Sequence, residues 1–123
     1  MSFIQKSSLR KDFAMGFLFS KKQIKKAYVP NGPEGCFATK RVTVDGKKVG
    51  YMYREEPDAD SELPDSGWRF FAGDETEEYT DDPDNINIFS LNTICNYDSD
   101  IIPYLDAPYG SAFVRKGNKF VKD

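Results

Sequence analysis

The residues best suited to chemistry are carboxylates gathered in one run. Seven lie between positions 74 and 84: Asp74, Glu75, Glu77, Glu78, Asp81, Asp82 and Asp84. Oxygen-rich loops suit calcium or magnesium, and a carboxylate pair at a working separation can act as general acid and base. The spacing does not match an EF-hand loop, and nothing singles out one pair. A solvated acidic surface is the favoured interpretation, so we predict no metal and no cofactor.

Nothing else in the chain calls for an enzyme. The 123 residues include no histidine, which excludes the Ser-His-Asp triad, Cys-His pairs and histidine-ligated metals. There is no glycine-rich dinucleotide fingerprint and no Walker phosphate loop. We therefore predict a non-enzymatic protein with no catalytic residues.

Cysteine content and hydropathy indicate the cellular compartment in which the protein works. Cys36 and Cys95 stand far apart without a CxxC motif. A disulfide is open on parity, but two buried free thiols in a reducing cytosol are the more usual arrangement. No stretch approaches 18 consecutive apolar residues, so we expect no segment to span a membrane. The reduced thiols predict a cytoplasmic protein, and an acidic surface, which repels anionic lipid, predicts no membrane partner.

The net charge of −3 conceals a strong segregation. Residues 1–54 carry +9, residues 55–106 carry −15 and residues 107–123 carry +3. Part of this charge should pair on folding, but acidic groups remain in excess in the centre. Such a surface attracts a basic partner and repels polyanions, so we predict a protein partner and no nucleic acid.

Periodicity and turn residues predict a mainly antiparallel α+β domain with β-hairpins and two or three short helices. We expect a strand at 13–19, a short helix at 21–27, and a hairpin of strands 36–44 and 47–54 around Asp45-Gly46. A further strand is expected at 67–72, and residues 86–89 should lead into a helix at 91–96 capped by Ser90 or Asn87, followed by a helical turn around Pro103. A final hairpin should join 111–115 to 119–121. Residues 1–11 should be loose, leaving one domain over 12–121.

Two neighbouring residues stand out in the strand predicted at 67–72. Trp68 is expected to anchor the core. Arg69 is the only basic residue among sixteen acidic ones between positions 55 and 106. It is expected to hold acidic side chains in place, as a guanidinium fork can. A binding role for either residue is the alternative.

An ordered set of motifs gives the chain a family resemblance. The set comprises Gly67-Trp68-Arg69-Phe70-Phe71 with Gly73-Asp74-Glu75, Tyr79 with Asp81-Asp82-Pro83 and Asn85, Leu91-Asn92-Thr93-Ile94, and Ile102-Pro103-Tyr104-Leu105-Asp106-Ala107-Pro108 with Gly110-Ser111-Ala112-Phe113. Over roughly residues 14–116 the chain resembles the bacterial immunity protein 33-like family. The resemblance implies an α+β fold and a role in polymorphic toxin systems, where an immunity protein binds and blocks a toxin. It implies no catalytic residue and no metal.

Resemblance and composition together predict an inhibitor of a basic, nuclease-type toxin. The loops 55–66 and 73–85 are the expected contact face. The candidate residues are Trp68, Arg69, Asp74, Glu75, Glu78, Tyr79, Asp81 and Asp82. A homodimer is compatible with the high aromatic content. The alternative is a housekeeping module that binds a small ligand or a cell protein.

Overall fold

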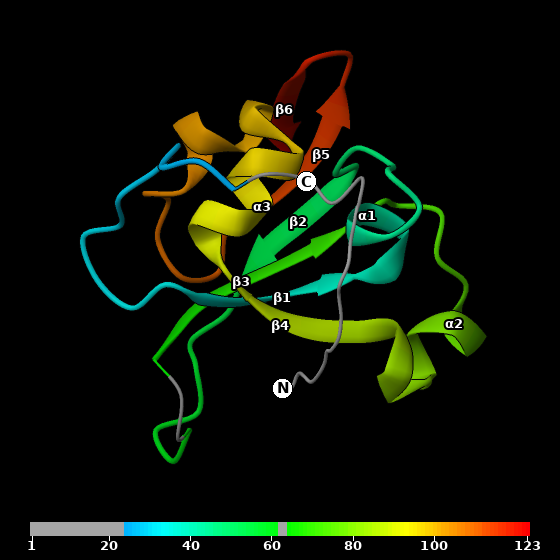
Figure 1. Ribbon diagram of the computed structural model, residues 1–123, viewed down its shortest axis with the longest axis horizontal. Helices are drawn as coiled ribbons and strands as arrows, with labels where there is room; N and C mark the ends of the chain where they lie inside the picture. The colour runs from blue at the N-terminus through cyan, green and yellow to red at the C-terminus, as the bar shows by residue number, and fades with distance from the viewer. Residues whose placement is uncertain (1–23, 62–63) are drawn as a thin grey trace.

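A mixed β-sheet organises the chain in the computed structural model, which describes residues 24–61 and 64–123 (Figure 1). Within these residues the sheet has six strands in the order β4-β1-β3-β2-β5-β6. The strands are β1 Gly35–Thr39, β2 Tyr51–Arg54, β3 Asp65–Phe71, β4 Ile86–Ser90, β5 Ala112–Lys116 and β6 Lys119–Lys122. Only the β1–β3 pair is parallel, and the other four pairs are antiparallel.

Short helices connect the strands. They are α1 Lys40–Thr43, α2 Glu77–Asp81 and α3 Leu91–Tyr97, with the 3-10 helices η2 Pro83–Asn85 and η3 Ser99–Tyr104. The hydroxyl of Ser90 accepts the backbone N–H of Thr93 and so caps α3. The α+β class predicted from the sequence is confirmed, as are the helix after Ser90, the turn around Pro103 and the final hairpin.

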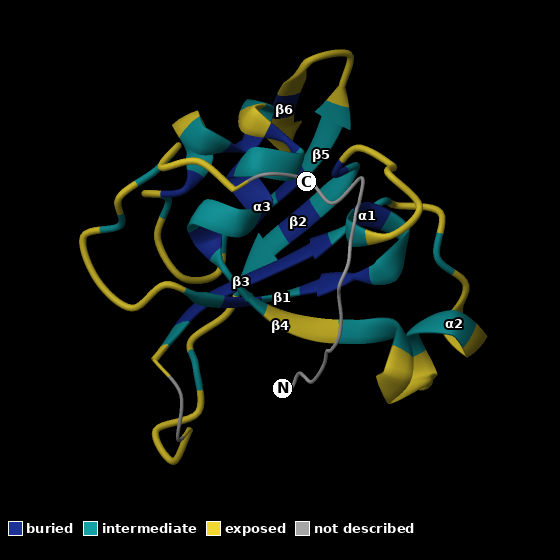
Figure 2. Cartoon of the chain, viewed as in Figure 1, coloured by how far each residue is buried: buried dark blue, intermediate teal, exposed yellow. Residues whose placement is uncertain are grey.

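The core lies between one face of the sheet and α1, α3 and η3 (Figure 2). Met52, Trp68 and Phe70 project from the central strands into this layer and are fully buried. Ile94 of α3 and Ile101 of η3 meet them from the other side. Because successive strand residues point to opposite faces, the residues that alternate with this set lie on the opposite face.

Gly67 allows β2 and β3 to pair closely near the start of β3. Its φ is +92°, and a Cβ there would lie 2.1 Å from the carbonyl oxygen of Glu55. No other residue type fits this conformation and this approach without strain. The backbone N–H of Gly67 is bound by a carboxylate oxygen of Asp65 at 2.8 Å.

The hairpin predicted at 36–54 is wrong. β1 ends at Thr39, the chain turns into α1, and β1 pairs with β3 and β4 instead of β2. Gly46 does take the positive φ expected at the turn, but Val42 enters the core from α1 and Val44 is 70% exposed. The expected pairing is replaced because β1 lies between β4 and β3, where it pairs on both sides, and tertiary packing of this kind overrides local alternation.

The short helix predicted at 21–27 is also wrong in its described part, since residues 24–27 are not helical. Two asparagines of α3 bind this segment instead. Asn92 accepts the backbone N–H groups of Ala27 and Tyr28, and Asn96 accepts that of Lys25. The predictions for residues 1–11, for the strand 13–19 and for residues 21–23 fall outside the described residues.

Both cysteines are buried free thiols, as predicted. Burial raises the pKa of the Cys36 thiol well above its usual value, and burial, followed by the charge of Asp98, raises the pKa of Cys95 to about 12. Both thiols are therefore protonated and unreactive at neutral pH. None of the described helices has the length and apolar character needed to span a bilayer.

Candidate protein-binding surface

The acidic segment 73–85 is fixed at its start by an arginine. The guanidinium of Arg41 donates through Nε to Asp74 Oδ1 at 3.1 Å and through Nη2 to Oδ2. Its Nη1 donates to Asp45 Oδ2 at 3.0 Å. The hydrogen bonds to Arg41 hold the pKa of Asp74 below its usual value. Asp74 is therefore already paired within the chain.

Glu75 accepts hydrogen bonds from the residues around it. Its Oε2 accepts the hydroxyl of Thr39 at 2.6 Å and the N–H of Ala72 at 2.8 Å, while Oε1 accepts the N–H of Gly73 at 2.9 Å. These three bonds close the turn after β3 and tie it to the end of β1. Glu75 is thus a structural residue rather than a free carboxylate.

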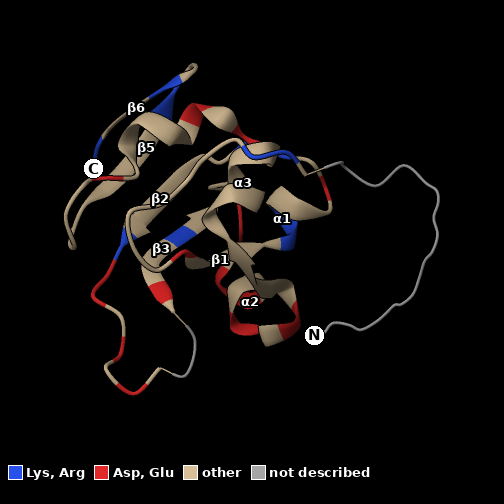
Figure 3. Cartoon of the chain, turned by 60° about the vertical axis from the view of Figure 1, so that its left-hand side comes forward, with Lys and Arg blue, Asp and Glu red and all other residues tan. Residues whose placement is uncertain are grey.

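The rest of the segment presents carboxylates to solvent. Thr76 caps α2 by accepting the N–H of Tyr79, and Asp82 caps η2 by accepting the N–H of Asp84. Five acidic residues are exposed and form no ion pair with any other residue in 24–61 or 64–123: Glu77, Glu78, Asp81, Asp82 and Asp84 (Figure 3). Half-buried Tyr79 lies on α2, next to Glu78 in sequence. Its pKa is raised by burial and then by the charges of Asp45 and Glu75.

Trp68 and Arg69 lie inside the sheet. Trp68 is fully buried, stacks on Phe70 and Phe113, and donates its indole N–H to the carbonyl oxygen of Leu105 at 3.1 Å. Its expected role as a core anchor is confirmed. With its side chain buried, it offers a partner no surface.

Arg69 is 6% exposed and lies flat on the face opposite the helices. It donates to both oxygens of Asp65, at 2.9 and 2.8 Å, and through Nε to Glu55 at 2.8 Å. Its guanidinium carbon is 4.4 Å from the ring centroid of Phe37. The expectation that Arg69 holds acidic side chains is confirmed, and the hydrogen bond to Arg69 lowers the pKa of Asp65.

The two acidic loops lie apart. Residues 55–61 precede β3, and residues 72–85 follow it, so the described parts of the loops extend from opposite ends of that strand (Figures 1 and 3). The eight residues selected from the sequence are accordingly not brought into one cluster. Asp74, Glu75, Glu78, Tyr79, Asp81 and Asp82 share one end of β3, while Trp68 and Arg69 are within it.

Sequence reasoning missed an aromatic surface between these ends. Tyr51, Tyr53 and Phe71 are half-buried on the face opposite the helices, with ring centroids 5.8 to 6.1 Å apart. Tyr51 and Tyr53 also line a groove of about 610 Å³ with Tyr109, Glu55 and Glu56. The alternation of the two tyrosines was visible in the sequence. The neighbour that completes the cluster was not, because it depends on the pairing of β2 with β3.

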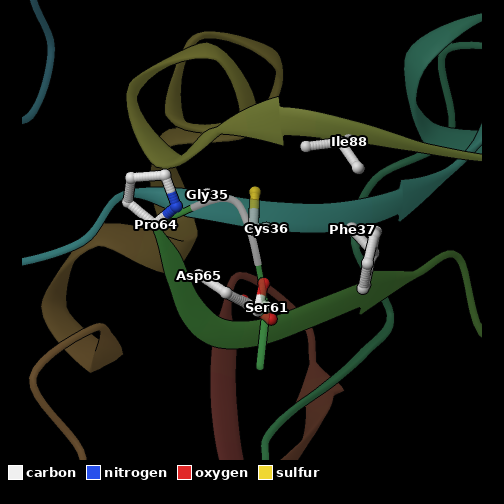
Figure 4. A pocket seen from close by; sticks show the side chains of 7 residues that line it. All are labelled: Gly35, Cys36, Phe37, Ser61, Pro64, Asp65 and Ile88. Carbon is white, nitrogen blue, oxygen red and sulfur yellow. The ribbon is translucent and has the colours of Figure 1, made fainter. Parts of the chain in front are cut away.

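A smaller cavity beneath β4 offers no room for a substrate. It holds about 50 Å³ and is lined by Gly35, Cys36, Phe37, Ser61, Pro64, Asp65 and Ile88 (Figure 4). Small-molecule sites usually measure about 300–1,000 Å³. Among the described residues no three histidine, cysteine or carboxylate side chains are grouped so as to hold a metal ion. The groove beside Tyr51 and Tyr53 falls within this range of volumes, whereas the cavity at β4 does not.

Comparison with protein families decides what kind of protein this is. The model of the Immunity protein Imm33 domain matches residues 36–123. The chain belongs to the Imm33 family. This match covers every strand from β2 to β6 and nearly all of β1, together with the acidic segment and the aromatic surface. Neither the curated proteins nor the solved structures provide a match to the chain.

Proposed function

We propose that this Imm33 protein is a cytoplasmic, non-enzymatic inhibitor that binds and neutralises a basic, nuclease-type toxin. Membership of an immunity-protein family supports the role. The observation that supports the charge of the partner is the row of exposed carboxylates on α2 and η2, which form no ion pair within residues 24–61 and 64–123. A nuclease presents basic groups to its nucleic acid, and an acidic inhibitor can occupy those groups.

The acidic segment is built to present its charges in a fixed arrangement. Asp74 and Glu75 attach it to Arg41, Thr39 and the turn after β3. A fixed arrangement loses less conformational entropy on binding than a mobile loop would. The same surface repels nucleic acid and anionic lipid, so the proposed partner is a protein.

The test begins with affinity capture of the tagged protein from its native lysate at low and high salt. The captured basic protein is then expressed with and without this chain in a sensitive host. We expect growth arrest by the captured protein alone and relief by co-expression. If co-expression gives no relief, the inhibitor role is wrong.

Charge reversal locates the contact. Glu78→Lys with Asp81→Lys should weaken the complex at least tenfold and reduce its dependence on salt. The matched control is Glu34→Lys with Asp106→Lys, because both residues are exposed and lie outside segment 73–85. Equal weakening by both pairs would point to net charge alone, and no weakening by the first pair would exclude α2 from the contact.

A further inference from the structure

We infer that the face of the sheet opposite α1, α3 and η3 is the centre of the partner interface. We infer further that it takes a protein surface with apolar or aromatic side chains flanked by arginine or lysine at both ends. The inference rests on the proposed function and specifies the site and the partner's chemistry. It adds the open sheet face to the acidic segment already described.

The aromatic centre is present and uncovered within the described residues. The helices α1, α3 and η3 all pack on the other face. Tyr51, Tyr53 and Phe71 belong to no part of that core and pack on one another. Ile88 of β4 and Val121 of β6 extend the apolar surface, at 53% and 45% exposure. Tyrosine and phenylalanine are enriched in the centres of protein interfaces.

An arginine beside these rings is held by two carboxylates. Arg69 lies opposite Tyr53 in the register of β2 with β3, is held by Asp65 and Glu55 and lies over the ring of Phe37. Its charge is thereby neutralised within the chain, so it does not repel a basic partner. A preformed surface with ordered side chains avoids part of the entropic cost of association.

Acidic groups flank the aromatic centre at both ends of β3. One end carries Glu55, Glu56, Asp58 and Asp60, and the other carries the exposed carboxylates of α2 and η2. Residues 55–61 at the first end and residues 73–85 at the second include no lysine or arginine. β3 spans roughly 20 Å at about 3.3 Å per residue, so a complementary partner carries its cations about that far apart. An apolar centre with a charged rim is the usual anatomy of a protein interface.

The direct test uses a short synthetic peptide, about as long as β3, with arginines at both ends and leucine and phenylalanine between them. Its titration is followed by the backbone amide signals of the isotope-labelled protein. We expect saturable shifts at Tyr51, Tyr53 and Phe71, and at least fivefold weaker binding of the same peptide with glutamates replacing the arginines. Tyr53→Ser should weaken binding at least fivefold. Val29→Ser, a matched control at an exposed apolar residue on the helix side, should not.

Several results would overturn the inference. These are shifts that do not saturate, shifts centred on residues 24–30, or equal binding by Tyr53→Ser and the unmodified protein. Shifts of the same amides that depend on protein concentration without peptide would assign the face to a second copy of this chain. Peptide binding without growth rescue would reject the inhibitor role and retain the face. Rescue without peptide binding would reject the face and retain the role.

Discussion

The two faces of the sheet put similar residues to different use. On the helix-covered face, Trp68 and Phe70 are fully buried and stacked. On the open face, Tyr51, Tyr53 and Phe71 pack on one another at similar distances, with Tyr53 stacked on Phe71, but remain half-exposed. Neighbouring residues on the same strands therefore contribute either to the stability of the buried core or to the exposed surface of the open face.

The open face also contains a buried charge. Arg69 alternates with Trp68 and Phe70, and it would be costly to bury without partners. Asp65 and Glu55 provide them at 2.8 Å. The open face therefore depends on the ion pairs of Arg69, whereas the covered face depends on apolar packing. Substitutions on the two faces should separate stability from binding.

The largest expected effect is on the covered face. Trp68→Ala removes a ring with no exposed surface and leaves the carbonyl of Leu105 without its indole donor. We expect the free energy of unfolding to fall by about 3–5 kcal/mol, measured by urea denaturation. A loss below about 1 kcal/mol would mean that the core does not depend on this ring.

The next effect concerns the ion pair beneath the open face. Asp65→Asn leaves the Arg69 guanidinium short of one charged partner, and we expect a loss of about 1.5–3 kcal/mol at pH 7. The native pKa of Asp65 is lowered by Arg69. Its contribution is therefore complete above the ordinary aspartate pKa of about 3.9 and is lost as pH falls through the lower native value. The difference between variant and unmodified protein should shrink only below about pH 4.

The control for this profile is Glu56→Gln, because Glu56 is exposed and pairs with no described residue. Denaturant unfolding at pH 7 should give the same stability for this variant and the unmodified protein. If Asp65→Asn behaves like Glu56→Gln, Glu55 alone satisfies Arg69.

The smallest effect on stability should come from the open aromatic face itself. Tyr53→Ser removes ring contacts with Tyr51 and Phe71 at a half-exposed site. Cross-strand pairs contribute about 0.2–1 kcal/mol each, so we expect a loss of about 1 kcal/mol in thermal unfolding. A loss as large as that for Trp68→Ala would show that the two faces stabilise the protein equally.

Short-range signals predicted the parts of the chain that depend on neighbours in sequence. Ser90 before an apolar run marks the start of α3, and Lys116-Gly117-Asn118 marks the turn between β5 and β6. The functional family was also readable, because its motifs recur in order along the chain. The acidic character of residues 73–85 followed from composition alone.

Tertiary structure decided which of these acidic residues are free. The sequence does not show that Arg41 takes Asp74 or that Thr39 takes Glu75, since both pairs form across more than thirty residues. The sequence also did not show that β1 pairs with β3. This pairing replaces the expected hairpin. The two acidic loops lie at opposite ends of β3. Residue types and local turns are fixed by short-range chemistry, whereas strand neighbours depend on which arrangement buries the most apolar surface.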